Sequence, residues 1–324
     1  MVLARQKLQR NLQLLLPALQ IGRCSPIPCF PKPVSNITIQ GVGDFYDLEK
    51  LCVLGHGNHG IVYKVLHKPS SATYALKIVQ DDITNSSASH ETEILACTDS
   101  PFVVKCHGIF EPRAGEKAIL MEHMDAGTLD TVLRANGPFH ETLIAHIAYQ
   151  ALNGLSYLHA CSIVHLDIKP SNLLVSKDMK VKIGDFGVSR IVDSGMTSHD
   201  NLGSQGTYAY MSPERLDSQT FGSMYIYAGD VWSLGVTLWE LYVGYFPFFP
   251  AGKRPSWMEV AMVICFGEFP SFPKQASQEF RSFLKCCLER EPSKRWTVSQ
   301  LLSHPFVRMQ GEPNRLLPFA QISL

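Results

Sequence analysis

Two short apolar runs around a turn constrain this chain more than any other stretch. Residues 173–175 are Leu-Leu-Val, residues 177–178 are Lys-Asp, and residues 181–183 are Val-Lys-Ile. Short apolar runs on either side of a turn predict a β-hairpin, in which the second strand returns to the start of the first. The hairpin would therefore bring Asn172, just before its first strand, beside Asp185, just after its second.

The residues around this hairpin carry two acids, an amide and a cation in a fixed order. Asp167, Lys169 and Asn172 precede it, and Asp185-Phe186-Gly187 begins thirteen residues after Asn172. Phosphoryl transfer from a magnesium nucleotide needs a carboxylate that orients a hydroxyl, oxygen ligands for metal ions, and a cation for the developing phosphate charge. The alternative is an acidic hairpin in an unrelated fold, and the number of ordered positions argues against it.

Residues 165–172, His-Leu-Asp-Ile-Lys-Pro-Ser-Asn, together with Asp185-Phe186-Gly187 resemble the catalytic loop and magnesium motif of eukaryotic protein kinases. The resemblance implies an α+β fold of two lobes, a small β-rich lobe with one helix and a larger, mainly helical lobe. It implies that Asp167 orients the substrate hydroxyl, that Lys169 stabilises the transferred phosphoryl group, and that Asn172 and Asp185 bind Mg²⁺ beside ATP. One position departs from the family, because Leu166 stands where most members carry Arg.

A second set of residues indicates the nucleotide site. The glycines at 55, 57 and 60 lie between two apolar runs, as in a hairpin whose backbone amides close over phosphates. Lys77 lies in the apolar run 74–79, where a buried ammonium needs a counter-charge. Glu91 and Glu93 compete for this role, and we choose Glu91 by register. The Ser-rich residues 85–89 predict a helix of low intrinsic stability there.

Residues 119–121 read as the last strand of the small lobe, and residues 122–124 as the hinge to the larger lobe. The hinge backbone would bind an adenine ring, and Met121 would close the pocket behind it. The kinase resemblance then implies that the nucleotide contacts Leu54, Gly55, His56, Gly57, Asn58, His59, Gly60, Val62, Ala75, Lys77, Glu91, Met121, Glu122 and Met124.

Two patterns describe the larger lobe. Apolar residues between 143 and 158 repeat with the period of a helix that leads to the catalytic loop. Residues 230–239 are apolar nearly all round, which predicts a buried helix. Asp230 at its start would need hydrogen-bond donors, and the resemblance supplies them as catalytic-loop amides. Glu214 and Arg295 would form a buried ion pair.

Residues 193–206, between the Asp-Phe-Gly motif and the buried helix, contain few apolar side chains, and we call them the activation segment. Such a segment can stay disordered until phosphorylation adds charge to it. Ser212-Pro213-Glu214, with the preceding Gly-Thr, Tyr210 and Met211, resembles MAP kinase kinases. The stretches 226–233 and 265–268 are similar to the plant branch of that family. The resemblance implies dual specificity for Thr and Tyr in the activation loop of a downstream MAP kinase, and an upstream MAP kinase kinase kinase as activator.

The phosphoacceptors of the activation segment can be aligned with those of the plant branch in two registers. In the plant branch two Ser or Thr acceptors are separated by five residues. Ser198 and Ser204 keep that separation, whereas alignment from Gly206 selects Thr197 and Gly203. We hypothesise that activity depends less on these sites than in relatives, because Leu166 cannot hold a phosphate as Arg does. The alternative is that other basic groups replace the missing Arg.

The kinase resemblance covers residues 46–308, divided into a small lobe (46–121), a hinge (122–124) and a larger lobe (125–308). Residues 309–324 would be a C-terminal tail. Residues 1–45 are rich in Pro and Ser and predict a disordered tail. Within residues 5–16, a basic cluster next to alternating leucines resembles the motif by which MAP kinase kinases hold their substrates; the alternative is an amphipathic tail without a partner. Its residues are Arg5, Lys7, Arg10, Leu12 and Leu14, or Leu14 with Leu16.

The composition excludes several other classes of function. A hydrophobic content of 45% and a net charge of zero indicate a soluble globular protein without a nucleic-acid or membrane partner. The nine cysteines lack paired CxxC spacing, which is typical of reduced intracellular thiols. The apolar run 14–16 ends at Pro17 and is too short for a signal peptide. We expect a cytoplasmic monomer, with the nucleus as a second compartment. Two rival functions are a pseudokinase scaffold and a Ser/Thr kinase outside the MAP kinase cascade.

Overall fold

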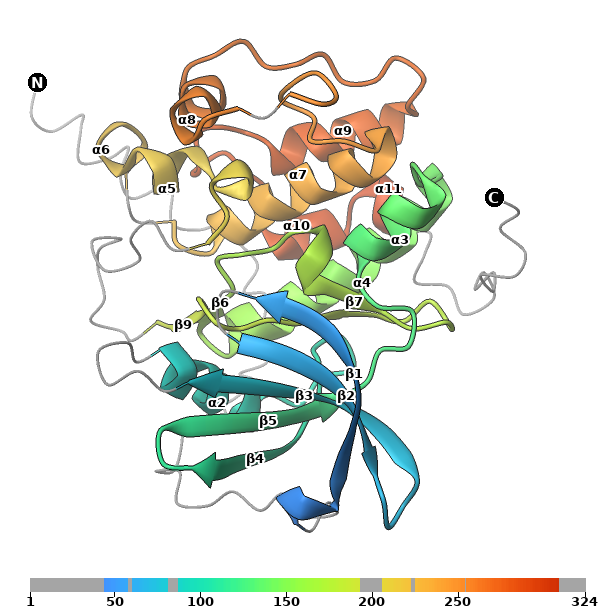
Figure 1. Ribbon diagram of the computed structural model, residues 1–324. Helices are drawn as coiled ribbons and strands as arrows, with labels where there is room; N and C mark the ends of the chain where they lie inside the picture. Colours follow the sequence, from blue (N-terminus) through green and yellow to red (C-terminus); the bar gives the residue numbers. More distant parts are fainter. Residues whose placement is uncertain are drawn as a thin grey trace, which may run out of the picture. The chain divides into compact units, whose positions relative to one another are not determined.

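The computed structural model describes residues 44–57, 60–80, 87–192, 206–222, 225–253 and 255–308 (Figure 1). All of them belong to one compact unit, Pro31–Leu324. The strands of the larger sheet come from the first part of the described chain and most of the helices from the second part. This arrangement confirms the predicted α+β fold of two lobes.

The small lobe is built on an antiparallel sheet of five strands in the order β1-β2-β3-β5-β4. Side chains alternate between the two faces of a strand. Leu76 therefore packs with Val65 and Leu120 on one face, while Ala75 and Lys77 point to the opposite face. The elements of this lobe are a 3-10 turn η1 (Phe45–Asp47) and the strands β1 (Leu48–Gly57), β2 (Gly60–His67), β3 (Ala72–Gln80), β4 (Cys106–Arg113) and β5 (Glu116–Glu122).

The helix of the small lobe, α2 (Ser87–Cys97), begins within the Ser-rich stretch whose intrinsic helix propensity is low. Ile94 and Leu95 on this helix are fully buried in the main hydrophobic core, and Glu91 is 1% exposed. Tertiary packing usually contributes more to the stability of a short helix than propensity does. Packing of these side chains therefore explains why the helix forms from an unfavourable sequence.

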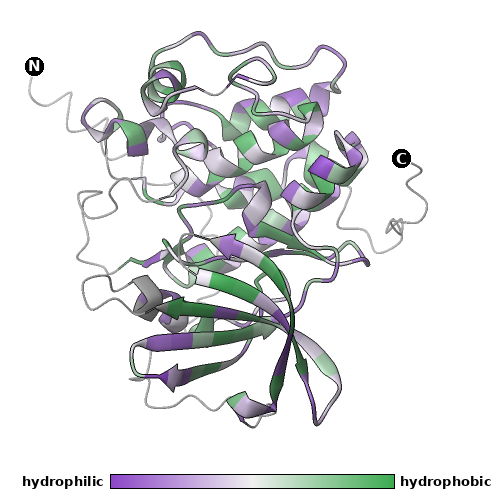
Figure 2. Ribbon diagram, in the orientation of Figure 1, coloured by the Kyte–Doolittle hydropathy of each residue, from purple (hydrophilic) through white to green (hydrophobic). Residues whose placement is uncertain are grey.

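The second part of the described chain is mainly helical. Helices α4 and α7 pack against each other in its core, and residues 231–239 of α7 are all buried, as the apolar pattern predicted. Figure 2 shows hydrophobic residues along these helices. The helices are α3 (Leu129–Asn136), α4 (Glu141–Ala160), α5 (Pro213–Leu216), α6 (Ser218–Phe221), α7 (Ala228–Val243), α8 (Trp257–Cys265), α9 (Gln278–Cys287), α10 (Val298–Leu302) and α11 (Pro305–Arg308), with 3-10 turns η2 (Pro170–Asn172) and η4 (Tyr208–Tyr210).

Two small antiparallel sheets hold the loop between α4 and the Asp-Phe-Gly motif. Strands β7 (Leu173–Val175) and β8 (Val181–Ile183) pair as the predicted hairpin. Strands β6 (Ile163–Val164) and β9 (Arg190–Ile191) pair across the loop. The amide of Gly184 donates to the carbonyl oxygen of Asn172 at 2.9 Å. The hairpin therefore brings the residue before Asp185 against Asn172, as the sequence predicted.

Candidate active site

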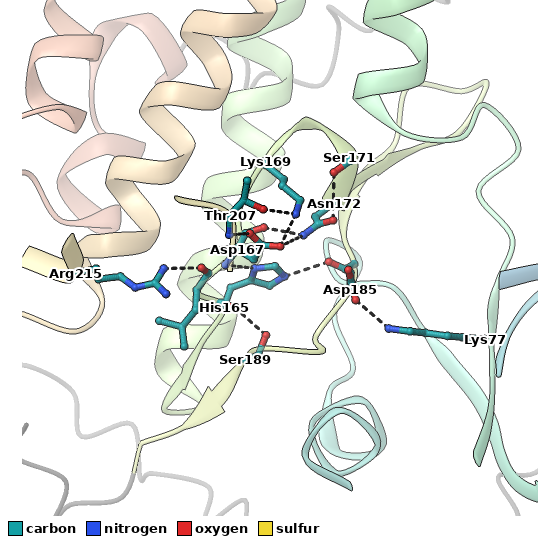
Figure 3. A network of polar contacts seen from close by, with 12 residues as sticks. Lys77, His165, Asp167, Lys169, Ser171, Asn172, Asp185, Ser189, Thr207 and Arg215 are labelled. Atoms are coloured by element: carbon teal, nitrogen blue, oxygen red, sulfur yellow. Dashed lines mark hydrogen bonds and ion pairs between the residues drawn. The ribbon is translucent and has the colours of Figure 1, made fainter. Parts of the chain in front are cut away.

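Asp167 is held in place through both oxygens of its carboxylate (Figure 3). Its Oδ2 accepts hydrogen bonds from Lys169 Nζ at 2.6 Å and from Asn172 Nδ2 at 3.0 Å. Its Oδ1 accepts from the backbone amide of Thr207 at 2.9 Å. The side chain of Asp167 is therefore fixed by a cation, an amide and a distant segment of the chain.

Lys169 connects the catalytic loop to the residues that follow the activation segment. Its Nζ donates to Thr207 Oγ1 at 2.6 Å, in addition to its ion pair with Asp167. Gly206 precedes Thr207 with φ of 101°, and a Cβ on it would lie 2.9 Å from the carbonyl oxygen of Leu166. A residue without a side chain is therefore required where this segment approaches the loop.

Asn172 turns its amide nitrogen toward Asp167. Nδ2 donates to the Asp167 carbonyl oxygen at 2.8 Å as well as to the carboxylate. Because the nitrogen is used in this way, Oδ1 is the atom that Asn172 can offer to a metal ion. Asp185 offers a carboxylate that is 44% exposed, two residues after the end of β8.

Lys77 forms the charged centre on the sheet side of the site. Its Nζ lies 2.6 Å and 2.8 Å from the two carboxylate oxygens of Glu91 and 2.9 Å from Oδ1 of Asp185. Burial acts to lower the pKa of Lys77, but the two carboxylates outweigh it and hold the pKa above its usual value. The ammonium is therefore charged, and these bonds go to Glu91 rather than to Glu93.

Asp230, in the first turn of α7, holds the backbone of the catalytic loop. It is 1% exposed and accepts hydrogen bonds from the amides of His165 at 3.0 Å and Leu166 at 2.8 Å. His159 on α4 contributes a third contact, from Nε2 at 2.9 Å. Burial acts to raise the pKa of Asp230, but the contact with His159 and the amide bonds outweigh it and lower the pKa below its usual value. A charged carboxylate thus fixes the backbone just before Asp167.

His165 holds the other side of this loop. Its ring contacts the carbonyl oxygen of Gly184 through Nε2 at 3.1 Å, and its Nδ1 accepts from the amide of Asp167 at 3.3 Å. These two bonds require the tautomer with the proton on Nε2. Ser189 Oγ donates to the His165 carbonyl oxygen at 3.0 Å. His165 therefore links the loop to the Asp-Phe-Gly motif.

Leu166 is 2% exposed and packs in an apolar cluster with Val164 and Ile226. Its φ of 68° is unusual for a residue with a bulky side chain. Two hydrogen bonds of its backbone hold this conformation. The Leu166 amide donates to Asp230, and the Leu166 carbonyl oxygen accepts from Arg215 Nη1 at 2.6 Å. The residue that departs from the family thus supports the loop by packing and by its backbone.

Glu214 and Arg295 form a fully buried ion pair, with two parallel bonds of 2.7 Å and 2.9 Å. Arg295 also donates to the carbonyl oxygen of Ala228 at 2.9 Å. Glu214 is the second residue of α5, just beyond η4, and Ala228 begins α7. The pair therefore ties the residues that follow the activation segment to the core of the larger lobe.

Comparison with known proteins assigns this geometry to a family. The model of the protein kinase domain matches residues 48–307. Mitogen-activated protein kinase kinase 9 of Arabidopsis thaliana is 51% identical over 95% of this chain and 99% of its own length. The chain belongs to the MAP kinase kinase family. Mitogen-activated protein kinase kinase 7 of Arabidopsis thaliana is 48% identical over the same shares of both chains. Protein kinase wis1 of Schizosaccharomyces pombe is 38% identical over 81% of this chain and 43% of its own length.

As a MAP kinase kinase the chain is a protein kinase, an enzyme that transfers phosphoryl groups, and its most similar relatives above are plant proteins. The matched span does not test the domain boundaries expected at residues 46 and 308, which stay predictions. Within the part of the chain that the structure describes, no helix is both long and apolar enough to span a membrane.

The residues expected to contact the nucleotide lie on the sheet and the hinge, apart from Glu91 on α2. Gly55 and His56 are on β1 and Val62 on β2, opposite Lys77 in register. Gly60 has φ of 136°, and a Cβ on it would lie 2.1 Å from the carbonyl oxygen of Ile78. The other described members are Leu54 and Gly57 on β1, Ala75 on β3 opposite Met121 on β5, Glu122 at the end of β5, and Met124 just after it.

The side chain of Glu122 is engaged elsewhere, because its Oε1 accepts from the Lys105 amide at 2.7 Å and from Lys182 Nζ at 2.6 Å. Its backbone amide donates to the carbonyl oxygen of Lys105 at 3.0 Å. The binding of an adenine ring by the hinge backbone stays a prediction. Several predicted site residues lie outside the described residues: Asn58 and His59, the phosphoacceptor candidates Thr197, Ser198 and Ser204, and the docking residues Arg5, Lys7, Arg10, Leu12 and Leu14.

Sequence analysis did not assign roles to four residues of the kinase site: His159, His165, Thr207 and Arg215. The structure places the ring of His159 against Asp230. Thr207 belongs to the Gly-Thr pair that helped to indicate the family, so its position carried a signal. His165 begins the motif at residues 165–172, so its position also carried a signal. The contact of Arg215 depends on tertiary packing and left no pattern in the sequence.

Proposed function

We propose that this kinase is a dual-specificity enzyme that phosphorylates Thr and Tyr in the activation loop of a MAP kinase. The observation that supports phosphoryl transfer to a hydroxyl is the fixed carboxylate of Asp167, joined to Lys169 at 2.6 Å and to Thr207 at 2.9 Å. Similarity to MAP kinase kinases over 95% of the chain supports the choice of substrate. An enzyme of this kind acts between an upstream kinase kinase kinase and a downstream MAP kinase.

The residues present fit ATP with Mg²⁺. Magnesium is usually held by one or two protein ligands together with substrate phosphates. Asp185 offers a partly exposed carboxylate, and the hairpin sets Asn172 against the residue before it. Lys77, held by Glu91, would bind the α and β phosphates beside the glycine-rich strands. Bound Mg²⁺ would neutralise charge that develops on the transferred phosphoryl group.

The protein residues have separate tasks in this reaction. Asp167 would orient the substrate hydroxyl and accept its proton. The bonds to both of its carboxylate oxygens fix the side chain in place for this task. Lys169 stabilises the negative charge near the acceptor, and Thr207 keeps its ammonium in place. Asp230 and His165 fix the loop backbone that carries both groups. This preorganised set of charges is the kind that stabilises a transition state.

A panel of kinase-dead MAP kinases tests the substrate assignment. The purified kinase is incubated with each one and ATP, and the phosphorylated sites are mapped by mass spectrometry. We expect phosphate on both Thr and Tyr of the activation loop of at least one substrate. Phosphate on Ser or Thr alone, without Tyr, would place the enzyme outside the cascade as an ordinary Ser/Thr kinase.

The pseudokinase alternative has one observation in its favour, the Leu at position 166. Asp167→Asn or Lys77→Met separates the two functions, because each change removes a group needed for phosphoryl transfer and leaves the surface unchanged. Cellular signalling that survives either change would show that the protein acts as a scaffold.

The tail residues Arg5, Lys7 and Arg10 with their neighbouring leucines would bind the downstream MAP kinase. The basic groups fit an acidic patch and the leucines an apolar groove. Deletion of residues 1–16 should raise KM for the MAP kinase and leave turnover unchanged. An unaltered KM would exclude the docking role.

Leu166 supports a further part of the proposal, that turnover depends less on phosphorylation of the activation segment than in kinases with Arg at this position. The buried cluster around Leu166, the bond that its amide donates to Asp230 and the bond that its carbonyl oxygen accepts from Arg215 would hold the loop independently of a phosphate.

The expected cytoplasmic location, with access to the nucleus, stays a prediction that microscopy of a fluorescent fusion would test. The expected monomeric state also stays a prediction.

A further inference from the structure

Lys182 on β8 forms an ion pair with Glu122 at the end of β5. Its Nζ lies 2.6 Å from Oε1 of Glu122. The two side chains are 13% and 24% exposed, so salt and water screen this pair less than a pair on the open surface. The pair is separate from the bonds that hold Asp167 and Lys77. Its charges therefore act at a distance from the reacting groups.

The carboxylate of Glu122 has a second partner, the backbone of Lys105. Oε1 of Glu122 accepts from the Lys105 amide at 2.7 Å, and the Glu122 amide donates back to the Lys105 carbonyl oxygen at 3.0 Å. Burial lowers the pKa of the neighbouring His107 despite the charge of Glu122. This imidazole is therefore neutral at neutral pH, and Lys182 supplies the ammonium that Glu122 binds.

Strand β8 is bound to the same segment of the small lobe. The amide of Ile183 donates to the carbonyl oxygen of Phe102 at 2.9 Å, and its carbonyl oxygen accepts from the amide of Val104 at 2.9 Å. Residues 102–105 are thus bonded to β8 at one end and to the hinge at the other. The bond from Lys182 to Glu122 closes these contacts into a ring. The hinge cannot shift along β8 without breaking part of this ring.

The ring of contacts lies between two predicted parts of the nucleotide site. Asp185, a predicted magnesium ligand, follows Lys182 by three residues. The amide of Gly184, between them, donates to the carbonyl oxygen of Asn172 and fixes this end of the hairpin. At the other side of the ring, Glu122 begins the hinge that would bind the adenine ring. The ring of contacts therefore joins the places expected for the two ends of ATP.

We propose that Lys182 and Glu122 are positioning residues that hold the adenine site at a fixed distance from Asp185. A ligand with two joined ends gains most affinity when its two subsites already have the spacing of the ligand. ATP with Mg²⁺ has two such ends, whereas adenosine reaches only the hinge. This inference rests on the proposed binding of ATP with Mg²⁺ by the hinge and Asp185.

The experiment compares the affinity of the kinase for adenosine with its affinity for a non-hydrolysable ATP analogue in the presence of Mg²⁺. Lys182→Met removes the charge and keeps an unbranched side chain. We expect the Kd of the analogue to rise roughly fivefold, as expected for a partly buried, charge-assisted bond. The Kd of adenosine should stay within about twofold of the wild type, because adenosine does not span the two subsites. Calorimetric titration measures both.

Steady-state kinetics supply a second readout. KM for ATP should rise with the Kd of the analogue, and kcat should stay within about twofold, because Asp167 and Lys169 are held by other bonds. A purely structural role would not separate KM from kcat in this way.

Three further variants serve as controls. Lys182→Arg keeps the charge and should bind both ligands as the wild type does. Lys180→Met removes an exposed lysine two positions earlier and should change neither affinity. Glu122→Gln keeps an acceptor for the Lys105 amide and should weaken the analogue as Lys182→Met does. The double variant should be no weaker than either single one, because both changes remove the same bond.

Three outcomes would overturn the proposal. The first is an unchanged Kd of the analogue for Lys182→Met. The second is an equal loss of affinity for adenosine, because the pair would then shape only the hinge. The third is a higher kcat with unchanged affinities, which would show that the pair restrains turnover. If Lys182→Met does not fold, Glu122→Gln decides by the same comparison.

Failure of the proposed use of ATP would have a different signature. The wild type would then bind the analogue with Mg²⁺ no more tightly than adenosine, and both proposals would fall. A preference for the analogue that the wild type shows and Lys182→Met retains in full would reject only the positioning role.

Discussion

The ammonium of Lys77 lies 2.9 Å from a carboxylate oxygen of Asp185, a residue 108 positions later in the chain. Glu91 on α2 shares the same ammonium at 2.6 Å. One cation therefore joins the sheet, the helix of the small lobe and the Asp-Phe-Gly motif. The position of α2 and the position of Asp185 depend on the same buried charge.

Replacement of Lys77 by Met should reduce phosphoryl transfer by at least about a hundredfold, since the nucleotide phosphates lose their cation. It should also lower the free energy of unfolding by about 3 kcal/mol, because Glu91 stays buried without its partner. The double change Lys77→Met with Glu91→Leu should recover much of the stability and none of the activity. Thermal unfolding and a kinase assay would measure the two effects. Equal stability of the single and double variants would show that the pair is not coupled.

Replacement of Asp230 by Asn should destabilise the protein by about 3 kcal/mol at neutral pH, because an amide nitrogen would face a backbone donor of His165 or Leu166. The folded-state pKa of Asp230 lies below the ordinary value of 3.8. Its charge therefore contributes stability above that value, and the contribution is lost as pH falls through the lower folded-state pKa. The difference in unfolding free energy between wild type and variant should be constant near neutral pH and shrink below about pH 4. Urea titrations across this range would measure it, and a difference that grows toward acid would contradict the charged state of Asp230.

Replacement of Leu166 by Arg should lower the turnover of the unphosphorylated kinase by about tenfold, because a guanidinium enters an apolar cluster. The variant should regain activity when an upstream kinase phosphorylates the segment. Leu166→Met, which nearly conserves volume, should behave as the wild type does. Turnover before and after treatment with the upstream kinase is the measurement. A wild type activated on the order of a hundredfold, with phosphate on Ser198 or Ser204, would refute the assigned role of Leu166.

Replacement of Thr207 by Val should reduce turnover by about tenfold and leave KM for ATP unchanged. The change removes the hydroxyl that accepts a bond from Lys169 at 2.6 Å, while the backbone amide that holds Asp167 remains. Thr207→Ser keeps the hydroxyl and should retain activity. Steady-state kinetics of the two variants would separate the hydroxyl from the side-chain volume. A serine variant as slow as the valine variant would show that Thr207 acts through packing instead.

Local patterns predicted the parts of the site that neighbouring residues form. The hairpin from Leu173 to Ile183 follows from two apolar runs and a turn, and its strands pair as expected. The buried ammonium of Lys77 required a counter-charge, and register indicated Glu91, which the structure places against it. These inferences succeed because each depends on the alternation of a strand or the period of a helix.

Contacts between distant segments left weaker signals. The bond from Lys169 to Thr207 spans 38 positions, and the contact of His159 with Asp230 spans 71. Neither follows from periodicity, because each depends on how the elements pack. Helix α2 begins at Ser87 although the helix propensity of its sequence is low. The burial of Ile94 and Leu95 outweighs that low propensity. The packing of Leu166 against Ile226 could likewise be seen only in three dimensions.

The carboxylate that fixes the catalytic loop has a consequence for the synthesis of this enzyme. Asp230 follows the amides that it holds by 64 and 65 positions, so it leaves the ribosome well after them. We expect a nascent chain that ends before α7 to possess Asp167 and Asp185 and yet be unable to transfer phosphate. The protein would thus acquire activity only late in translation, when the larger lobe is nearly complete.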